Sequence, residues 1–201
     1  MADDSAYAPF QIARRADGTR RELGDGARGV TYQATNPQLG RVVALKVINA
    51  TFINDPMVRQ RFLAEARAAA RLQHPNVASV SHLRADGEDV FYAMEFVEGE
   101  TAESYVRRRD SLPAHLALRI IQQAAQGLAA ANEHGLIHRD IKPANLMRAH
   151  PPAAAGTPDD EADDGLLVKV IDFGVAKSIS ADGSSAALSG DGGIGPGSGH
   201  G

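Results

Sequence analysis

The stretch His138-Arg139-Asp140-Ile141-Lys142-Pro143-Ala144-Asn145 is the most specific segment of this 201-residue sequence. It gathers an acid, a lysine and an amide within a short span, directly after a segment with a helical pattern. A second motif, Asp172-Phe173-Gly174, follows the apolar run Leu166 to Ile171, which predicts a strand. The segment between them, Arg148 to Gly165, is rich in proline and acidic residues and predicts an inserted, solvated loop.

Upstream of this stretch, the sequence changes from strand patterns to helix patterns. Val77 to Leu83 and Val90 to Val97 predict two strands, and Gly99 marks the exit from their sheet. Apolar residues then recur at helical spacing from Pro113 to Glu133, and Gly135 can take the left-handed conformation that ends such a helix. Strands therefore come first in the chain, and helices second.

The N-terminal part of the chain also follows strand patterns. Arg20 to Asn49 predicts a strand, a glycine-rich turn and two further strands, the last of which is β-branched and apolar around one lysine. Asp55 and Pro56 then supply an N-cap and a first-turn proline for a helix from Met57 to Leu72.

The glycine-rich turn lies within Leu23 to Tyr32 and fits the pattern G-x-G-x-x-G through Gly24, Gly26 and Gly29. Missing side chains let backbone amides approach phosphate oxygens at such a turn. A hairpin that merely reverses the chain has the same pattern, and for the motif alone that is the more common case. A Rossmann-type site is disfavoured, because a further strand follows and no helix opens at the last glycine.

Lys46 lies within Val43-Ala44-Leu45-Lys46-Val47, where alternation puts Ala44 and Lys46 on one strand face. A lone lysine in a strand is usually a surface residue, but one flanked by apolar residues needs an anion to offset its desolvation. Glu65 on the following helix can provide one carboxylate, and a nucleotide can provide further negative charge. The alternative for Glu65 is a surface pair with Arg61, one helical turn earlier.

These four motifs, in this order, resemble those of eukaryotic-type protein kinases from about Leu23 to Lys177. The resemblance implies an α+β, protein-kinase-like fold. Residues 20–97 would form an N-terminal lobe, an antiparallel sheet with one helix of the αC type. Residues 98–177 would form the first, mainly helical part of an incomplete C-terminal lobe, and residues 1–19 would be an N-terminal extension.

The resemblance also implies roles for individual residues, with ATP and Mg²⁺ as cofactors. Asp140 would be the catalytic base, and Lys142 would neutralise charge on the transferred phosphoryl group. Lys46 would contact the α- and β-phosphates and be held in place by Glu65. The glycine-rich turn would cover the phosphates, and the Mg²⁺ ligands would be Asn145 and Asp172.

The segment Met94-Glu95-Phe96-Val97 resembles the hinge between kinase lobes. Met94 would be the gatekeeper, and the backbones of Glu95 and Val97 would meet the adenine edge. The expected nucleotide-binding residues are, in full, Leu23, Gly24, Gly26, Gly29, Thr31, Ala44, Lys46, Met94, Glu95, Val97 and Met147.

Lys142, two residues after Asp140, is typical of the Ser/Thr-specific subgroup, and His74-Pro75-Asn76 is similar to bacterial members. The sequence therefore predicts an ATP-dependent kinase acting on Ser or Thr of a protein substrate. Two alternatives stay open. One is a catalytically inactive ATP-binding fragment or interaction module, and the other is a small-molecule phosphotransferase of kinase-like fold.

The composition adds expectations about partners and location. A formal net charge of −4 with dispersed basic residues gives no reason to expect nucleic acid as a partner. The sequence has no cysteine, which fits a reducing compartment, so we expect a cytoplasmic location. We expect no membrane segment, because charge or amide interrupts each apolar run. His74, His138 and the acidic run Asp159 to Asp164 lack the ligand spacing of metal sites.

The C-terminal residues depart from the kinase pattern. Ser178 to Gly201 is rich in Gly and Ser and predicts disorder. No Ala-Pro-Glu-like motif follows Lys177, so the sequence predicts a kinase truncated within the activation segment. Serines in this tail, beginning with Ser178, are expected sites of activating phosphorylation, with Arg139 as the partner of the phosphate.

Overall fold

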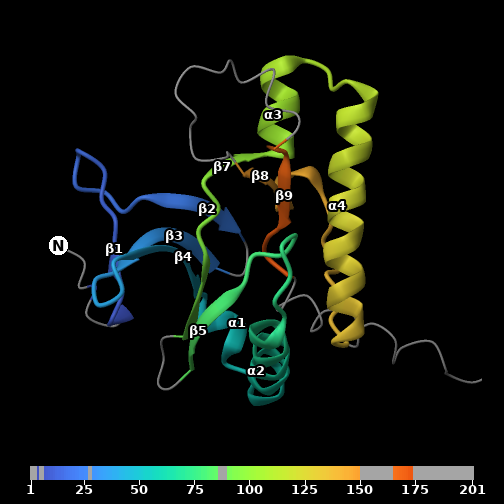
Figure 1. Ribbon diagram of the computed structural model, residues 1–201. Coiled ribbons are helices and arrows are strands. Elements are labelled where there is room, and N and C mark those ends of the chain that lie inside the picture. Colours follow the sequence, from blue (N-terminus) through green and yellow to red (C-terminus); the bar gives the residue numbers. More distant parts are fainter. Residues whose placement is uncertain (1–3, 5–6, 27–28, 86–89, 150–164, 174–201) are drawn as a thin grey trace, which may run out of the picture.

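A six-stranded sheet and a three-stranded sheet, both antiparallel, form the frame of the computed structural model (Figure 1). It describes residues 4, 7–26, 29–85, 90–149 and 165–173. The predicted disordered tail and residues 150–164 of the predicted insertion lie outside these ranges.

The six-stranded sheet has the order β1-β3-β4-β6-β5, and β2 pairs with β3 beside β1. Its strands are β1 (Gln11–Ile12), β2 (Glu22–Gly26), β3 (Gly29–Asn36), β4 (Arg41–Ile48), β5 (Val80–Arg84) and β6 (Val90–Glu95). The prediction of a strand, a glycine-rich turn and two strands is confirmed by β2, β3 and β4. Strand β1 was not predicted.

Gly29 shows why the turn between β2 and β3 needs glycine. Its φ is 149°, and a Cβ built there would lie 2.0 Å from the Val47 carbonyl oxygen. A side chain would therefore collide with β4, the strand that β3 pairs with along its whole length. Residues 27 and 28, between β2 and β3 in the sequence, lie outside the described ranges.

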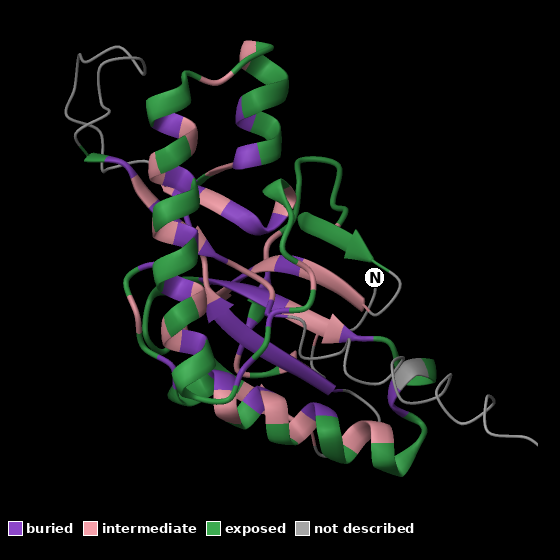
Figure 2. Ribbon diagram, turned by 90° about the vertical axis from the view of Figure 1, so that its right-hand side faces the viewer, coloured by how far each residue is buried: buried purple, intermediate pink, exposed green. Residues whose placement is uncertain are grey.

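The two faces of the six-stranded sheet belong to two cores. Val43 and Leu45 of β4 pack in an outer core with Phe10 and Phe91, whereas Ala44 belongs to the inner core that the helices complete. This alternation confirms that Ala44 and Val43 face opposite ways. The strands of the sheet's centre are largely buried, while α2 and α4 each show buried and exposed sides (Figure 2).

Helix α2 (Pro56–Arg71) covers the inner face of the sheet, after the short helix α1 (Ala50–Ile53), which was not predicted. The Asp55 carboxylate accepts hydrogen bonds from the N–H groups of Met57 and Val58, which confirms the predicted N-cap. Phe62 is fully buried against the sheet. The helix matches the predicted bounds to within one residue at each end.

The three-stranded sheet has the order β7 (Gly99–Thr101), β8 (Leu146–Ala149) and β9 (Leu167–Val170). Two sequence interpretations are corrected here. Gly99 does leave the first sheet, but it also begins β7 and so enters the second. Arg148 was expected to begin the solvated loop, yet it is buried in β8, because β8 pairs with β7 and β9; its guanidinium lies 4.7 Å from the Tyr105 ring centroid.

The second sheet is accompanied by α3 (Ala102–Arg109), α4 (Ala114–Glu133) and the 3-10 turn η2 (Pro143–Asn145). Helix α4 agrees with the predicted helix, and Gly135 has the expected left-handed φ of 72°.

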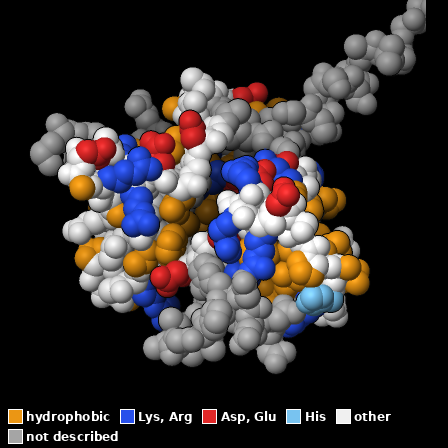
Figure 3. All heavy atoms as spheres, turned by 90° about the horizontal axis from the view of Figure 1, so that it is seen from above, with side chains coloured by type: hydrophobic (Ala, Val, Ile, Leu, Met, Phe, Trp, Pro, Cys, Tyr) orange, Lys and Arg blue, Asp and Glu red, His pale blue; other side chains and the backbone are white. Residues whose placement is uncertain are grey.

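Basic side chains of α3 are paired with acids, as between Arg108 and Glu100 at 2.7 Å. On the face seen from above, basic and acidic side chains are interspersed (Figure 3).

A polar network joins α4 to β9. The Gln123 amide donates to the Leu166 carbonyl (2.8 Å) and accepts from the Val168 N–H (2.8 Å) and from the Asn76 amide (2.9 Å). Asn76, which is buried, also donates to the Val168 carbonyl at 2.8 Å. The segment between α2 and β5 is thereby fixed to the strand that leads into Asp172.

In the described ranges, the helices are too short or too polar to cross a membrane.

Candidate active site

The His138 to Asn145 stretch forms a loop whose shape depends on His138. This ring is buried, its Nδ1 accepts from the Asp140 N–H (3.2 Å), and its Nε2 lies 3.0 Å from the Ile171 carbonyl oxygen. The neutral ring with its proton on Nε2 satisfies both contacts. The ring also packs on Phe173, with centroids 4.9 Å apart. His138 therefore holds the loop against the segment that carries Asp172.

Asp140, Lys142 and Asn145 are brought together by the loop and by η2. The buried Asn145 donates from Nδ2 to the Asp140 carbonyl at 2.8 Å. The Lys142 amine lies 3.3 Å from an Asp140 carboxylate oxygen. The Ile171 N–H donates to the Asn145 carbonyl at 3.0 Å, which links Asn145 to the residue before Asp172.

Lys46 reaches the same region from β4. Its amine is paired with Oδ1 of Asp172, and its side chain is only 14% exposed. The Tyr92 hydroxyl donates to the same Oδ1 at 3.2 Å. Asp172 has a left-handed φ of 56°. The structure therefore joins Lys46 of the first sheet to Asp172, which follows β9 of the second.

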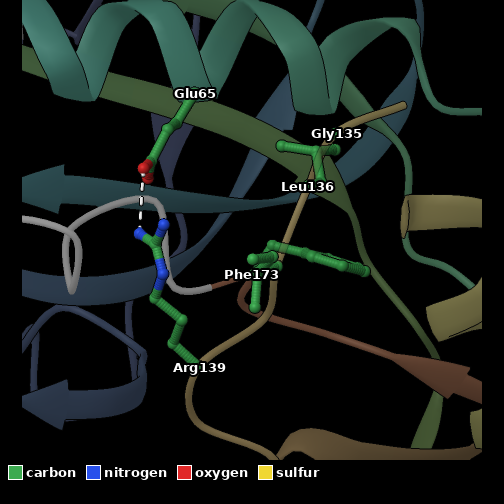
Figure 4. Close-up of a pocket in the computed structure, with 6 residues that line it drawn as sticks. Glu65, Gly135, Leu136, Arg139 and Phe173 are labelled. Carbon is green, nitrogen blue, oxygen red and sulfur yellow. Dashed lines mark hydrogen bonds and ion pairs between the residues drawn. The ribbon is translucent and has the colours of Figure 1, made fainter. Parts of the chain in front are cut away.

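Glu65 is paired differently from the sequence expectation. Its carboxylate lies 3.1 Å from the Arg139 guanidinium (Figure 4). The partner of Lys46 is instead Asp172. Figure 4 shows Glu65 pointing from α2 toward Arg139, with Leu136 and Phe173 beside them in the pocket. The expected contact between Lys46 and Glu65 is thus replaced: Lys46 is paired with Asp172, and Glu65 is paired with Arg139 of the loop from His138 to Asn145.

Burial perturbs two titratable groups of the site. It raises the pKa of the Glu65 carboxyl above its ordinary value, and the hydrogen bond and charge of Arg139 oppose that rise. It also raises the pKa of the Tyr92 phenol well above its ordinary value, and the neighbouring Asp172 carboxylate raises it further. Tyr92 is consequently a neutral hydrogen-bond donor at ordinary pH.

The expected adenine-binding residues lie around the end of β6. In the sheet register, Ala44 of β4 is opposite Met94 of β6, and both are buried. Thr31 of β3 is opposite Lys46. Val97 is buried just beyond β6.

Other expected nucleotide contacts are more exposed or come from the second sheet. Leu23 is 43% exposed, and Gly24 and Gly26 are exposed on β2, with Gly29 half-buried at the start of β3. Met147 is half-buried in β8, where it pairs with Thr101 of β7.

Glu95, in the segment expected to form the hinge, is joined to the second sheet. Its carboxylate lies 3.0 Å from the Lys169 amine of β9, and its backbone N–H donates to the Ser79 carbonyl at 2.9 Å. The Glu95 N–H, one of the groups expected to meet the adenine edge, therefore has a partner within the protein.

Sequence reasoning missed three participants of this region: Tyr92, Lys169 and the partnership of Arg139 with Glu65. A signal for Tyr92 was present, because it precedes Met94 by two residues and strand alternation puts both on one face. Arg139 was assigned to a phosphate partner only. Its pairing with a residue of α2 depends on how the helix sits over the loop, which local patterns do not encode.

The residues expected to bind Mg²⁺ fit that ion chemically. Asp172 offers a carboxylate and Asn145 an amide oxygen, and oxygen donors are what Mg²⁺ prefers. Their two segments are joined by the hydrogen bond from the Ile171 N–H to the Asn145 carbonyl. Both bonds that Asp172 makes to Lys46 and Tyr92 use Oδ1.

Comparison with known proteins agrees with this geometry. The chain is 36% identical over 167 residues to the serine/threonine-protein kinase PknA of Mycobacterium tuberculosis, a match that covers 81% of this chain and 36% of PknA. It is 40% identical over 180 residues to the serine/threonine-protein kinase PknJ of Mycobacterium bovis, with 89% of this chain and 27% of PknJ covered. The chain thus spans about a third or less of the length of these relatives.

A solved structure is similar as well. The PknI kinase domain of Mycobacterium tuberculosis has a TM-score of 0.66 and 29% sequence identity, over 84% of this chain and 61% of that one. The family model described as protein kinase domain matches residues 18–191. The match extends over most of the sequence and includes all four motifs, so the chain belongs to the protein kinase domain family.

Proposed function

We propose that this chain is an ATP- and Mg²⁺-dependent protein kinase that transfers the γ-phosphoryl group of ATP to a Ser or Thr hydroxyl. One observation carries the proposal. Lys46, Asp140, Asn145 and Asp172 come from β4, the catalytic loop, η2 and the end of β9, yet short contacts join them in one region. These are the charges and oxygen donors that phosphoryl transfer needs.

In the proposed reaction, a bond forms between the acceptor hydroxyl oxygen and the γ-phosphorus, and the bond from that phosphorus to its bridging oxygen breaks. Asp140 takes the proton of the hydroxyl. His138 and Asn145 hold the backbone of Asp140 on both sides, which keeps its carboxylate oriented. Lys142, 3.3 Å from Asp140, can shift to the transferred group and offset its negative charge.

Lys46 and Asp172 would no longer be paired when a nucleotide binds. Lys46 is buried and needs an anionic partner, a role that Asp172 fills in the structure. Nucleotide phosphates can replace Asp172 as that partner, which frees the carboxylate. Asp172 and Asn145 would then hold Mg²⁺, which supplies positive charge next to the phosphates when bound.

Glu65 would complete the arrangement by changing partners. Once Arg139 releases it, the Glu65 carboxylate can support Lys46 in contact with the phosphates. Burial disfavours the charged form of Glu65, so its carboxylate needs a neighbouring cation. Lys46 would take that place once Arg139 has moved away. Arg139, in turn, becomes available to a phosphate group in the residues after Gly174.

The adenine would lie between Ala44 and Met147, next to Met94. The Glu95 carbonyl and the Val97 N–H would face its polar edge. Leu23, Thr31 and the glycines of the turn would cover the sugar and phosphates. Protein substrates and a cytoplasmic site of action belong to the same proposal, because the cytoplasm supplies ATP; a nucleic-acid partner has no part in it.

One alternative has specific support, namely a module that binds ATP without turnover. The pairing of Lys46 with Asp172 and of Glu65 with Arg139 differs from the arrangement that the proposed reaction requires. If these pairs persist after nucleotide binding, the site binds ATP, but Lys46 does not reach the phosphates and Asp172 does not bind Mg²⁺.

Incubation with Mg²⁺ and γ-labelled ATP, together with a peptide library degenerate around Ser or Thr, tests the proposal. We expect label on Ser and Thr, and we expect Asp140→Asn to lower the rate about a hundredfold or more while it keeps nucleotide binding. Binding without any transfer by the wild-type chain would support the alternative. Equal rates for both chains would refute the role of Asp140.

A further inference from the structure

Tyr92 is a polar side chain in an otherwise apolar position. It lies in the middle of β6, is 3% exposed, and its hydroxyl donates to Oδ1 of Asp172 at 3.2 Å. The two residues are far apart in sequence: Tyr92 lies in the six-stranded sheet, whereas Asp172 follows β9 of the three-stranded sheet. The hydrogen bond therefore joins β6 directly to the expected metal ligand.

The surroundings of Tyr92 make Asp172 its natural partner. Its ring packs against Phe62 of α2, with centroids 6.3 Å apart. Together with Leu72, Met94 and Phe173, it lines a small cavity next to Asp172. Because the rest of that lining is mainly aliphatic or aromatic, a buried hydroxyl gains most by turning to the carboxylate.

The direction of the bond is fixed by chemistry. An ionised carboxylate only accepts hydrogen bonds, so the phenol is the donor. Lys46 binds the same oxygen, and two donors on Oδ1 set the orientation of the whole group. Oδ2 is the oxygen that these two bonds do not use.

Nucleotide binding affects the two donors differently. Lys46 exchanges Asp172 for phosphate in the proposed reaction, and its contact with Oδ1 is lost. Tyr92 is enclosed between α2 and the Asp172 segment, and phosphates do not compete for its hydroxyl. The bond from Tyr92 is thus the one that can persist when Asp172 has to bind a cation.

We propose that Tyr92 is a positioning residue, which orients the Asp172 carboxylate for Mg²⁺-nucleotide through its hydroxyl group. The inference rests on the proposed function. It predicts that removal of this one oxygen weakens the response to Mg²⁺ while the nucleotide cleft itself stays formed.

The test compares Tyr92→Phe with wild type by the melting shift in excess ATP over a series of Mg²⁺ concentrations. We expect the Mg²⁺ concentration for the half-maximal shift to rise about tenfold, since hydrogen bonds to charged groups are the stronger ones. Tyr105→Phe, which removes the hydroxyl of another buried tyrosine, should match wild type. Identical curves for Tyr92→Phe and a responsive wild type would overturn the inference and leave the proposed function intact.

A second measurement needs no ligand. Urea unfolding of wild type, Tyr92→Phe, Asp172→Ala and the double variant forms a double-mutant cycle. Tyr92→Phe should lower stability clearly in the wild-type background and much less in the Asp172→Ala background. An equal effect in both backgrounds would refute the bond itself. A wild-type chain that shows no Mg²⁺-dependent shift would refute the proposed function first, and with it the positioning role.

Discussion

The charged side chains of the candidate site are paired across elements that are distant in the sequence. Lys46 on β4 is paired with Asp172, and Glu65 on α2 is paired with Arg139 of the loop from His138 to Asn145. Each pair satisfies a charge that would otherwise be costly to bury. In the proposed reaction both pairs open, and the site changes from these pairs to contacts with phosphate and Mg²⁺.

The raised pKa of Glu65 makes the stability of the folded protein depend on pH. Because its pKa is raised in the folded state, folding favours the protonated form, and that stabilisation is complete below the ordinary glutamate pKa of about 4.3. This stabilisation is lost as the pH rises through the raised pKa of Glu65 in the folded state. Wild type should therefore lose stability relative to Glu65→Gln between about pH 4 and about pH 7.

Urea unfolding at both pH values measures this difference. Glu103→Gln is the matched control, because Glu103 has a 52% exposed side chain on α3. A stability difference between wild type and Glu65→Gln that stays constant with pH would contradict the assignment of a raised pKa.

The motifs predicted candidate residues that the structure brings into one region, but they did not predict how these residues are paired. Asp140, Asn145 and Asp172 could be identified because their motifs are short and local. The partners of Glu65 and Lys46 depend on how α2 lies over the sheet and on the left-handed conformation at Asp172. Neither property has a local signal in the sequence.

Among the elements, those with strong local patterns were predicted well. Helix α2 has an N-cap and a first-turn proline, and α4 has a long apolar repeat that ends at a left-handed glycine. Strands β7 and β8 were missed because each is short and its pairing partner is remote in the chain. Arg148 was misread for this reason, since a buried arginine in a strand looks like surface charge in the sequence.

Gly127 on α4 illustrates a packing requirement that helix propensity hides. A Cβ at this position would lie 2.6 Å from the Asn76 carbonyl oxygen, in the segment that is fixed to β9. Alanine would favour the isolated helix by about 1 kcal/mol. We nevertheless expect Gly127→Ala to destabilise the protein by about 1–3 kcal/mol, because the contact is with backbone and cannot relax locally.

Thermal or urea unfolding checks this prediction. Gln126→Ala, at an exposed neighbouring position of the same helix, should be close to neutral or slightly stabilising. A Gly127→Ala protein as stable as wild type would show that α4 does not approach the Asn76 segment so closely.

For the whole molecule, the described segment from residue 7 to residue 12 is part of the fold. Residues 1–19 were expected to be an N-terminal extension; within them, Phe10 and Ile12 are buried in the outer core, and β1 pairs with β3. Asp4 joins this segment through ion pairs with Arg14 at 2.7 Å and Arg20 at 2.5 Å. Phe10 and Ile12 therefore cover part of the outer face of the six-stranded sheet.

Phe10→Ala tests this role of the N-terminal segment. Phe10 is 4% exposed and contacts Phe91 edge-on, with centroids 6.2 Å apart. Its truncation should cost about 3–5 kcal/mol in the free energy of unfolding. Leu39→Ala, at a 69% exposed position, is the control and should have little effect. Similar stabilities for the two variants would contradict a structural role for the segment.

The central claim is that the region between the two sheets binds Mg²⁺-ATP through Lys46. Melting of the purified chain with and without Mg²⁺-ATP, beside the Lys46→Met variant, tests it most directly. At a hundredfold excess over the dissociation constant, ligand binding should stabilise wild type by about 2.7 kcal/mol, and the variant should lose most of the shift. A wild-type chain without a shift, or a variant that shifts equally, would contradict the claim.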